Sequence, residues 1–139
     1  MTREDKELLL KDLCARLPYG VKVQIDLQSD TYPQITCKVC SIEYAESGSA
    51  FIGVETSPDT YNEFREFLCK PYLFPLSSMT EEQKVIYGDL CYAVIRSLAC
   101  DMQAALNELV DWFNKNQFDY RGLIEKGLAI DATNLNIYP

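Results

Sequence analysis

The apolar positions at the start of the chain recur at the spacing of a helix. Between Thr2 and Leu17 they fall three and four residues apart, at Leu10, Leu13, Cys14 and Leu17, which places them on one face of an amphipathic helix. Thr2 is expected to cap this helix, with Asp5 at the position that completes a capping box. The turn Pro18-Tyr19-Gly20 is expected to end it. The pattern therefore predicts a helix within residues 1–17.

From Val21 onward the apolar residues occur at every second position instead of every third or fourth. Apolar and polar residues then alternate as far as Gln28, which is typical of a strand with one polar face. A second strand is expected at about 34–44, and a shift of the apolar phase near Ser41 indicates a bulge. A turn at 46–49 leads into a third strand at 50–55. Residues 21–55 are therefore predicted to form a three-stranded antiparallel meander.

Residues 56–76 have a less regular pattern. We expect a loop over 56–59 and then a short helix, whose inner face would hold Tyr61, Phe64, Phe67 and Leu68. The segment from Pro71 to Leu76 contains two prolines, which exclude regular helix and a central strand. We therefore expect this segment to be extended and packed across the domain.

A helical pattern continues from about residue 80 to 116. Ser78 or Thr80 is expected to cap it, because both are followed three residues later by Glu or Gln. A single helix of that length would measure about 55 Å, against about 35 to 40 Å for the whole domain. We therefore expect a break near Gly88 or between Ser97 and Asp101. The alternative is a long helix that packs in an intermolecular bundle. A last short helix at 120–126, capped by Asp119 and closed by Gly127, would precede a tail at 128–139.

These elements predict one α+β domain over residues 1–139. Its parts are a helix at 1–17, the antiparallel sheet at 21–55, a mainly helical half at 56–127 and the tail. We expect the helices after Thr80 and the amino-terminal helix to cover the sheet, with apolar burial as the main stabilising force.

The net charge and the absence of histidine narrow the classes of function that the chain can have. The chain has 13 Lys and Arg against 21 Asp and Glu, a net charge of −8, and no histidine. The absence of histidine disfavours nucleophile–histidine pairs and imidazole metal sites. The negative charge disfavours nucleic acid and acidic membranes as partners. No apolar run reaches the roughly 18 residues of a membrane span, and the polar start is unlike a signal peptide, so we expect a cytoplasmic protein.

Cysteines and carboxylates are the remaining candidates for chemistry. The six cysteines are expected to stay reduced. Cys37 and Cys40 have CxxC spacing, but residues three apart in a strand point to opposite faces, and no second ligand pair accompanies them. Asp59 with Glu82 and Lys84 fits a loose metal-nuclease pattern, although helix capping and the helix dipole explain both acids as well. We therefore assign no catalytic residue, no cofactor and no metal ligand.

Two groups of residues are candidates for an interaction surface. The first is acidic and consists of Glu43, Glu46, Glu55, Asp59, Glu63 and Glu66, with one base, Arg65, among them. A solvated face explains it without a partner, whereas the functional interpretation is binding to a basic protein surface or mimicry of nucleic-acid charge. The second group is aromatic, Trp112 and Tyr120 with Arg121 beside them, for which core packing is the simpler explanation.

Two blocks of the sequence resemble known proteins. One is Lys70-Pro71-Tyr72-Leu73 with Pro75-Leu76-Ser77-Ser78-Met79-Thr80-Glu81-Glu82, and the other is Phe118-Asp119-Tyr120-Arg121-Gly122-Leu123-Ile124-Glu125-Lys126-Gly127-Leu128-Ala129. They resemble small uncharacterised proteins that gut Bacteroidales genomes and their prophages encode. The resemblance implies a mobile-element setting and supplies no catalytic residue.

The sequence thus favours a non-enzymatic interaction or regulatory module that acts on a protein partner through an acidic and partly aromatic surface. A homodimer formed through the helical region from Leu90 to Leu109 is one form of that interaction. The alternatives are a small metal- or cysteine-dependent enzyme and a phage assembly component, which would form a large closed oligomer.

Overall fold

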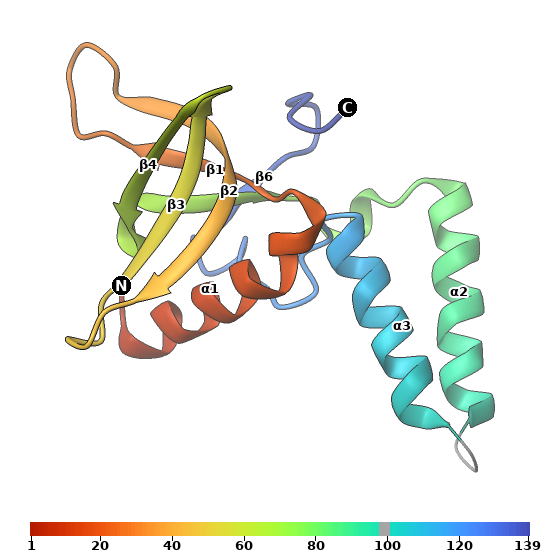
Figure 1. The fold of residues 1–139 in the computed structure, drawn as a ribbon. Helices are drawn as coiled ribbons and strands as arrows, with labels where there is room; N and C mark the ends of the chain where they lie inside the picture. The colour runs from red at the N-terminus through yellow and green to blue at the C-terminus, as the bar shows by residue number, and fades with distance from the viewer. Residues whose placement is uncertain (98–100) are drawn as a thin grey trace.

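The protein consists of a twisted sheet with one helix across its face and a helical hairpin that projects from it (Figure 1). The structure is a computed structural model that describes residues 1–97 and 101–139. Six strands form the sheet in the order β4-β3-β2-β1-β5-β6. The molecule is therefore a mixed α+β fold, as the sequence predicts in outline.

The first helix, α1 (Arg3–Arg16), confirms the predicted start. The Thr2 side chain accepts from the Asp5 N–H at 3.1 Å, and the Thr2 N–H donates back to the Asp5 carboxylate, so the capping box is complete. Leu9, Leu10 and Leu13 are buried against the sheet. This face covers the inner side of the strands, as expected.

The strands are β1 (Lys22–Asp26), β2 (Gln34–Tyr44), β3 (Ala50–Ser57), β4 (Thr60–Arg65), β5 (Cys69–Leu73) and β6 (Ile130–Asp131). The predicted alternation of buried and more exposed side chains is confirmed in β1, where Val23 and Ile25 are fully buried and their neighbours in the strand are not. The register of β2 on β3 shifts between Val39 and Ser41, at the predicted bulge.

The prediction of only three strands is wrong, and the first reason lies at residues 56–68. The expected loop and helix are instead the end of β3, the strand β4 and a short 3₁₀ turn. Ser57 pairs with Thr60 across a tight turn, so Pro58 and Asp59 are the two turn residues of a hairpin. The aromatic spacing that imitates a helix here belongs to a strand that β3 holds by its hydrogen bonds.

The second reason is that Pro71 lies in the interior of the sheet. β5 pairs antiparallel with β1, with Pro71 opposite Val23, and it pairs parallel with β6 on its other side. β6 is only two residues long and begins opposite Tyr72, so the ladder on that side starts after the proline. The short length of β6 thus makes room for a proline that a longer neighbour would exclude.

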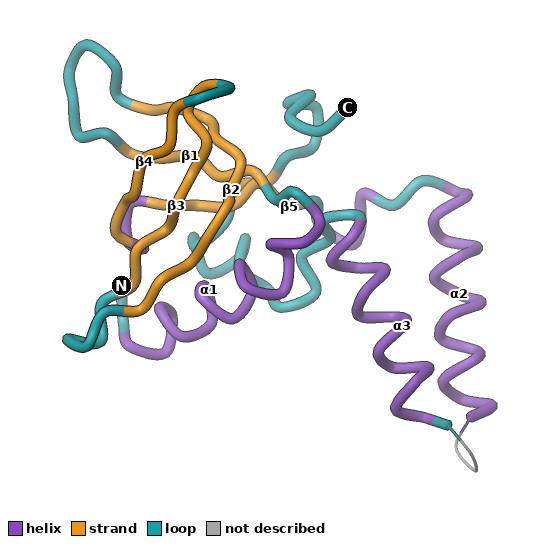
Figure 2. The backbone as a smooth tube through the Cα atoms, viewed as in Figure 1, coloured by secondary structure: helices purple, strands orange, loops and turns teal. Residues whose placement is uncertain are grey.

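The helices α2 (Glu81–Arg96) and α3 (Met102–Lys115) form a hairpin that points away from the sheet (Figure 2). They were expected to pack on the sheet, and that prediction is wrong. The break expected at Gly88 is also wrong, because Gly88 lies inside α2. Helix α2 ends at Arg96, within one residue of the second predicted break, whose residues 98–100 lie outside the described part of the chain. Among the described residues, no helix is both long and apolar enough to cross a membrane.

The carboxyl-terminal segment also differs from the prediction. Residues 121–127 form turns rather than a helix, although Asp119 does cap them by accepting from the Leu123 and Ile124 N–H groups at 2.9 and 2.8 Å. The expected tail supplies β6 and returns to the sheet. There the Tyr138 hydroxyl accepts from the Lys22 N–H and donates to the Tyr72 carbonyl, each at 2.9 Å.

The apolar interior is divided into two clusters. The larger one lies between α1 and the sheet and includes Leu13, Ile25, Ile52 and Leu73. The smaller one lies where the hairpin joins the body and is built on Met79, Phe113 and Phe118. The hairpin is therefore anchored at its base only, and the rest of its length has no apolar layer from the body.

Candidate interaction site

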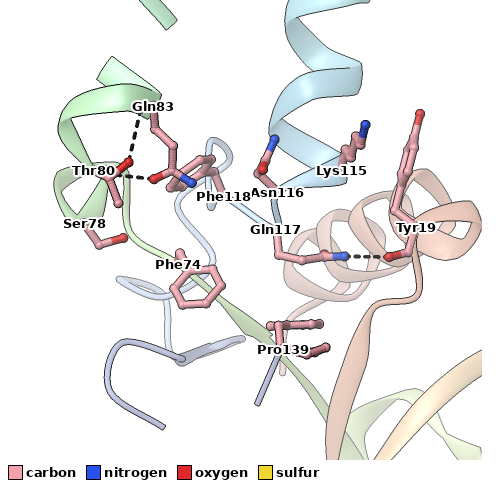
Figure 3. Close-up of a pocket in the computed structure, with 11 residues that line it drawn as sticks. Tyr19, Phe74, Ser78, Thr80, Gln83, Lys115, Asn116, Gln117, Phe118 and Pro139 are labelled. Atoms are coloured by element: carbon pink, nitrogen blue, oxygen red, sulfur yellow. Dashed lines mark hydrogen bonds between the residues drawn. The ribbon is translucent and has the colours of Figure 1, made fainter. Parts of the chain in front are cut away.

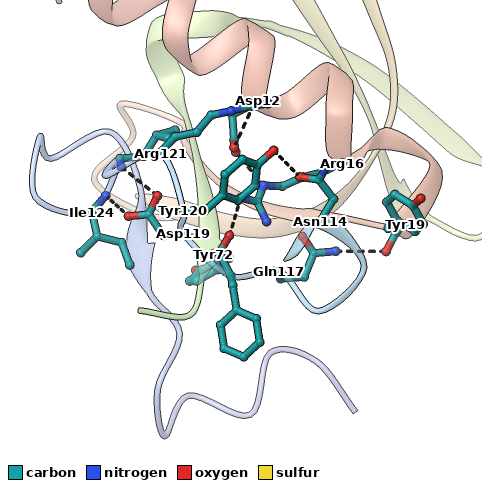
Figure 4. A network of polar contacts seen from close by, with 12 residues as sticks. Asp12, Arg16, Tyr19, Tyr72, Asn114, Gln117, Asp119, Tyr120, Arg121 and Ile124 are labelled. Carbon is teal, nitrogen blue, oxygen red and sulfur yellow. Dashed lines mark hydrogen bonds and ion pairs between the residues drawn. The ribbon is translucent and has the colours of Figure 1, made fainter. Parts of the chain in front are cut away.

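A buried ion pair fixes the base of the hairpin to α1 (Figure 4). Both side chains, Arg16 and Asp12, are fully buried, and Arg16 Nε lies 2.8 Å from Asp12 Oδ2. Arg16 Nη2 donates to the Phe118 carbonyl at 2.6 Å, and Arg121 Nη1 lies 3.4 Å from the other carboxylate oxygen of Asp12. Asp12 thus sits between two guanidinium groups and joins α1 to the segment that follows α3.

Tyr120 and Arg121, two of the predicted surface residues, belong to this junction. The Tyr120 ring stacks on Phe113 at 5.1 Å between centroids, and the guanidinium groups of Arg16 and Arg121 lie 5.4 and 4.8 Å from its centre. Its hydroxyl donates to Asn114 at 3.0 Å. These contacts use Tyr120 and Arg121 to build the junction, which matches the core-packing explanation.

Trp112, the other predicted aromatic residue, lies beside Phe113 in α3 and is half-buried. Its ring is 6.4 Å from Tyr87 of α2 and 5.4 Å from Phe118. Trp112 therefore packs between the two helices and the junction. The predicted acidic residues lie on a different part of the molecule, on the sheet and its turns. The two predicted groups do not form one surface.

A cleft of about 480 Å³ opens beside the junction (Figure 3). Thr80 and Gln83 on its wall form the capping box of α2, and Gln117 Nε2 donates to the Tyr19 carbonyl at 3.1 Å, while Gln117 Oε1 has no hydrogen-bond partner among the described residues. Phe74 and Phe118 supply its apolar wall. The Gln117–Tyr19 bond joins the end of α3 to the body, and Lys115 adds a charged side chain.

The predicted acidic residues are divided between several places. Glu43, Glu55 and Glu63 are exposed on the face of β2, β3 and β4 opposite to α1, since each occupies a register position on that face. Lys38 pairs with Glu55 and Arg65 lies two residues beyond Glu63, so bases lie among these acids. Glu46 and Asp59 lie in turns. The face is mixed in charge.

Glu66 corrects the prediction of a wholly exposed acidic patch, because it is buried at the edge of the sheet. Its carboxylate lies 3.2 Å from Lys6 Nζ of α1 and 3.4 Å from Arg65 Nε. Burial alone would raise the pKa of this carboxyl. Its own backbone N–H and the two cations outweigh burial and hold the pKa below its usual value. Glu66 therefore forms ion pairs with Lys6 and Arg65 that stabilise the fold.

We expect Glu66→Gln to cost about 1 to 2 kcal/mol at neutral pH, because it removes charged hydrogen bonds. Since the pKa of Glu66 is lower in the folded than in the unfolded state, its contribution is present above the unfolded pKa and is lost as the pH falls through the folded value. Urea unfolding at pH 7 and pH 3 should therefore show a gap between wild type and variant that shrinks at pH 3. A constant gap would contradict this assignment.

The cysteines do not converge on a site within the described residues. Cys37 is buried and Cys40 is exposed, which confirms that they face opposite ways. Burial raises the pKa of Cys37, and burial with the nearby Glu66 charge raises the pKa of Cys69 to about 12. In the same part of the chain, no group of three or more acidic or cysteine side chains could hold a metal ion. Cys100 lies outside the described residues.

Native thiol labelling should therefore separate the cysteines into two classes. Cys14 and Cys40 are exposed and should react rapidly with a maleimide, whereas Cys37 and Cys69 should react only when the sheet unfolds. Mass spectrometry of the labelled peptides gives the order in which the cysteines react. Early labelling of Cys69 would mean that the core is not packed as described.

The outer face of α2 carries the most unusual surface of the molecule. No residue of this helix is buried, yet Val85, Tyr92 and Ile95 are apolar and 65%, 60% and 63% exposed. An apolar stripe along a helix is normally buried against another element. We name the residues Val85, Gly88, Tyr92 and Ile95 the α2 stripe. The sequence interpretation missed it, although its spacing of three, four and three residues is visible in the sequence.

Comparison with protein-family models, with curated proteins and with solved structures finds no match for this chain.

Proposed function

We propose that the chain is a non-enzymatic protein-interaction module and that the helical hairpin is its binding element. The observation that supports this most strongly is the α2 stripe, because three large apolar side chains stand in water on a helix with no buried residue. Exposed apolar surface of this kind marks protein-binding sites. A helix that presents anchors three, four and seven residues apart is a common way for proteins to bind one another.

The design of the junction supports the same function. The buried pair Asp12–Arg16 and the Tyr120 ring fix the base of α3 to the body. A rigid base holds the hairpin at a defined angle, which lowers the entropy cost of binding. The proposal thus replaces the acidic face with the hairpin as the principal surface, since Lys38 and Arg65 interrupt the acids and Glu66 is buried.

The geometry gives little support to the enzymatic alternative. Asp59 lies in the β3–β4 turn and Glu82 in the first turn of α2, on separate parts of the molecule (Figure 1). Around the cleft, Thr80 and Gln83 bond to each other, and the Gln117 amide nitrogen donates to the Tyr19 carbonyl. A hydrolytic or redox site would need such groups to converge on an open space.

Photo-cross-linking in the native host tests the proposal. The photoreactive amino acid p-benzoylphenylalanine replaces Tyr92 in one variant and Tyr32 in a matched control, because Tyr32 is an equally exposed tyrosine in the β1–β2 loop. We expect a defined protein adduct, identified by mass spectrometry, from position 92 and none from position 32. No adduct from position 92, or the same adducts from both positions, would contradict the proposal.

A further inference from the structure

Helix α2 has two apolar faces on opposite sides. Tyr87, Leu90 and Val94 are half-buried toward α3, and the α2 stripe lies about half a turn away from them at 3.6 residues per turn. In Figure 1 α2 is the outermost element, with α3 between it and the body. Among the described residues, the body therefore does not reach the stripe, which leaves it open to another molecule.

The size of the stripe suits a weak interface. Burial of Val85, Tyr92, Ile95 and their flanks from two copies would remove about 800 Å² from water, since an aromatic side chain alone buries about 150 to 250 Å². This total lies below the roughly 1,200 Å² of stable complexes and within the range of transient ones. The expected association is reversible and depends on concentration.

The shape of the stripe is complementary to itself in the antiparallel direction. Two α2 helices that cross at residue 90 would place Val85 against Ile95 of the second copy and Gly88 against Tyr92 of the second copy. Gly88 is open, because a Cβ atom there would have no neighbour within 4 Å. The large Tyr92 ring of one helix thus fills the space that the glycine of the other leaves.

The flanking charges favour the same direction. Glu82 and Arg96 lie on the same flank of the stripe, near opposite ends of α2. Antiparallel pairing brings Glu82 close to Arg96 of the second copy twice, whereas parallel pairing would place these flanks on opposite sides of the interface and form neither contact. Asp89 lies near the two-fold axis on this flank and faces Asp89 of the second copy, and this contact weakens the pair.

We infer that α2 pairs antiparallel with α2 of a second copy of this chain and that the α2 stripe is the dimer interface. This inference rests on the proposed function and names its partner. The assembly is a row of four helices with α3 on the outside, and the two sheet bodies lie at opposite ends of the row. Symmetric pairing of one patch with itself is the commonest way in which identical chains associate.

Sedimentation equilibrium of the full chain, from low micromolar to submillimolar concentration, tests the inference. The wild type should shift from one to two chain masses. Tyr92→Glu should weaken the dimer at least about 100-fold, because it places a carboxylate in each half of the interface beside Asp89. The matched control Tyr32→Glu should leave the dimer unchanged. Asp89→Asn should tighten the dimer about twofold by removing the like-charge contact.

The outcomes separate the inference from the proposed function. A dimer that Tyr92→Glu abolishes and Asp89→Asn tightens supports the inference, provided that circular dichroism shows both variants folded. A wild type that stays monomeric, a dimer that survives Tyr92→Glu, or a large closed oligomer would overturn it. If the wild type stays monomeric and position 92 still cross-links to a different protein, the proposed function stands and only the choice of a second copy is wrong.

Discussion

Asp12→Ala is expected to lower the free energy of unfolding by about 3 to 5 kcal/mol, the largest effect of any single substitution at the junction. The variant leaves the fully buried Arg16 without its closest counter-charge, and in the part of the chain that the structure describes the Nη1 atom of Arg16 already has no hydrogen-bond partner. Removal of one member of a buried ion pair costs more than the pair itself contributes, because the remaining charge stays in a medium that solvates it poorly. Urea unfolding at neutral pH, followed by circular dichroism, measures the change.

A double variant provides the control. Asp12→Leu with Arg16→Met removes both charges and puts apolar side chains in their place, so we expect it to be more stable than Asp12→Ala. If Asp12→Ala costs less than about 1 kcal/mol, as an exposed pair would, the junction is not built as described.

Phe113→Ala has the second largest expected effect, about 3 to 5 kcal/mol for loss of a buried phenylalanine. Phe113 is buried in the smaller apolar cluster, where its ring lies 5.7 Å from Tyr87, 5.7 Å from Trp112 and 5.1 Å from Tyr120. Because this cluster is separate from the one under the sheet, the loss should loosen the hairpin first. Hydrogen exchange should show faster exchange in α2 and α3, with little change in β1 to β3.

Leu9→Ala is the matched control, because Leu9 is fully buried in the larger cluster. It should lower the protection of the sheet and of α1 as well as that of the hairpin. Equal loss of protection in every element of the Phe113→Ala variant would contradict the division of the interior into two clusters.

The features that the sequence predicts correctly are those with local causes. The Thr2–Asp5 capping box needs only residues within one turn, and it is present. The alternation in β1 and the bulge before Ser41 are likewise visible in the order of apolar residues. Each of these signals lies within a few residues, so one sequence is sufficient to recognise it.

The features that the sequence misses depend on distant partners. Tyr61, Phe64 and Phe67 have helical spacing, but pairing with β3 makes them part of a strand and its following turn. Pro71 is tolerated inside the sheet only because β6, about sixty residues later, is short. Neither condition can be found in the local pattern.

The candidate site was missed for a similar reason. Charged residues are normally expected at the surface, yet Arg16 is buried because the Phe118 carbonyl, 102 residues away, accepts from it. The helical pattern of 81–96 predicts α2 well, but it does not show that one apolar face of the helix stays exposed in the described part of the chain. Exposure of the α2 stripe is a property of the assembled fold.

Hydroxyl-radical footprinting of the intact chain shows whether a protein covers the α2 stripe. Tyr92 and Tyr32 have similar exposed fractions in the single chain, 60% and 70%, so they should be oxidised at similar rates when the chain is dilute. At high concentration we expect oxidation of Tyr92 to slow strongly while oxidation of Tyr32 does not change. If the two tyrosines are oxidised at equal rates at every concentration, and also in extracts of the native host, the proposal that a protein covers the stripe is contradicted.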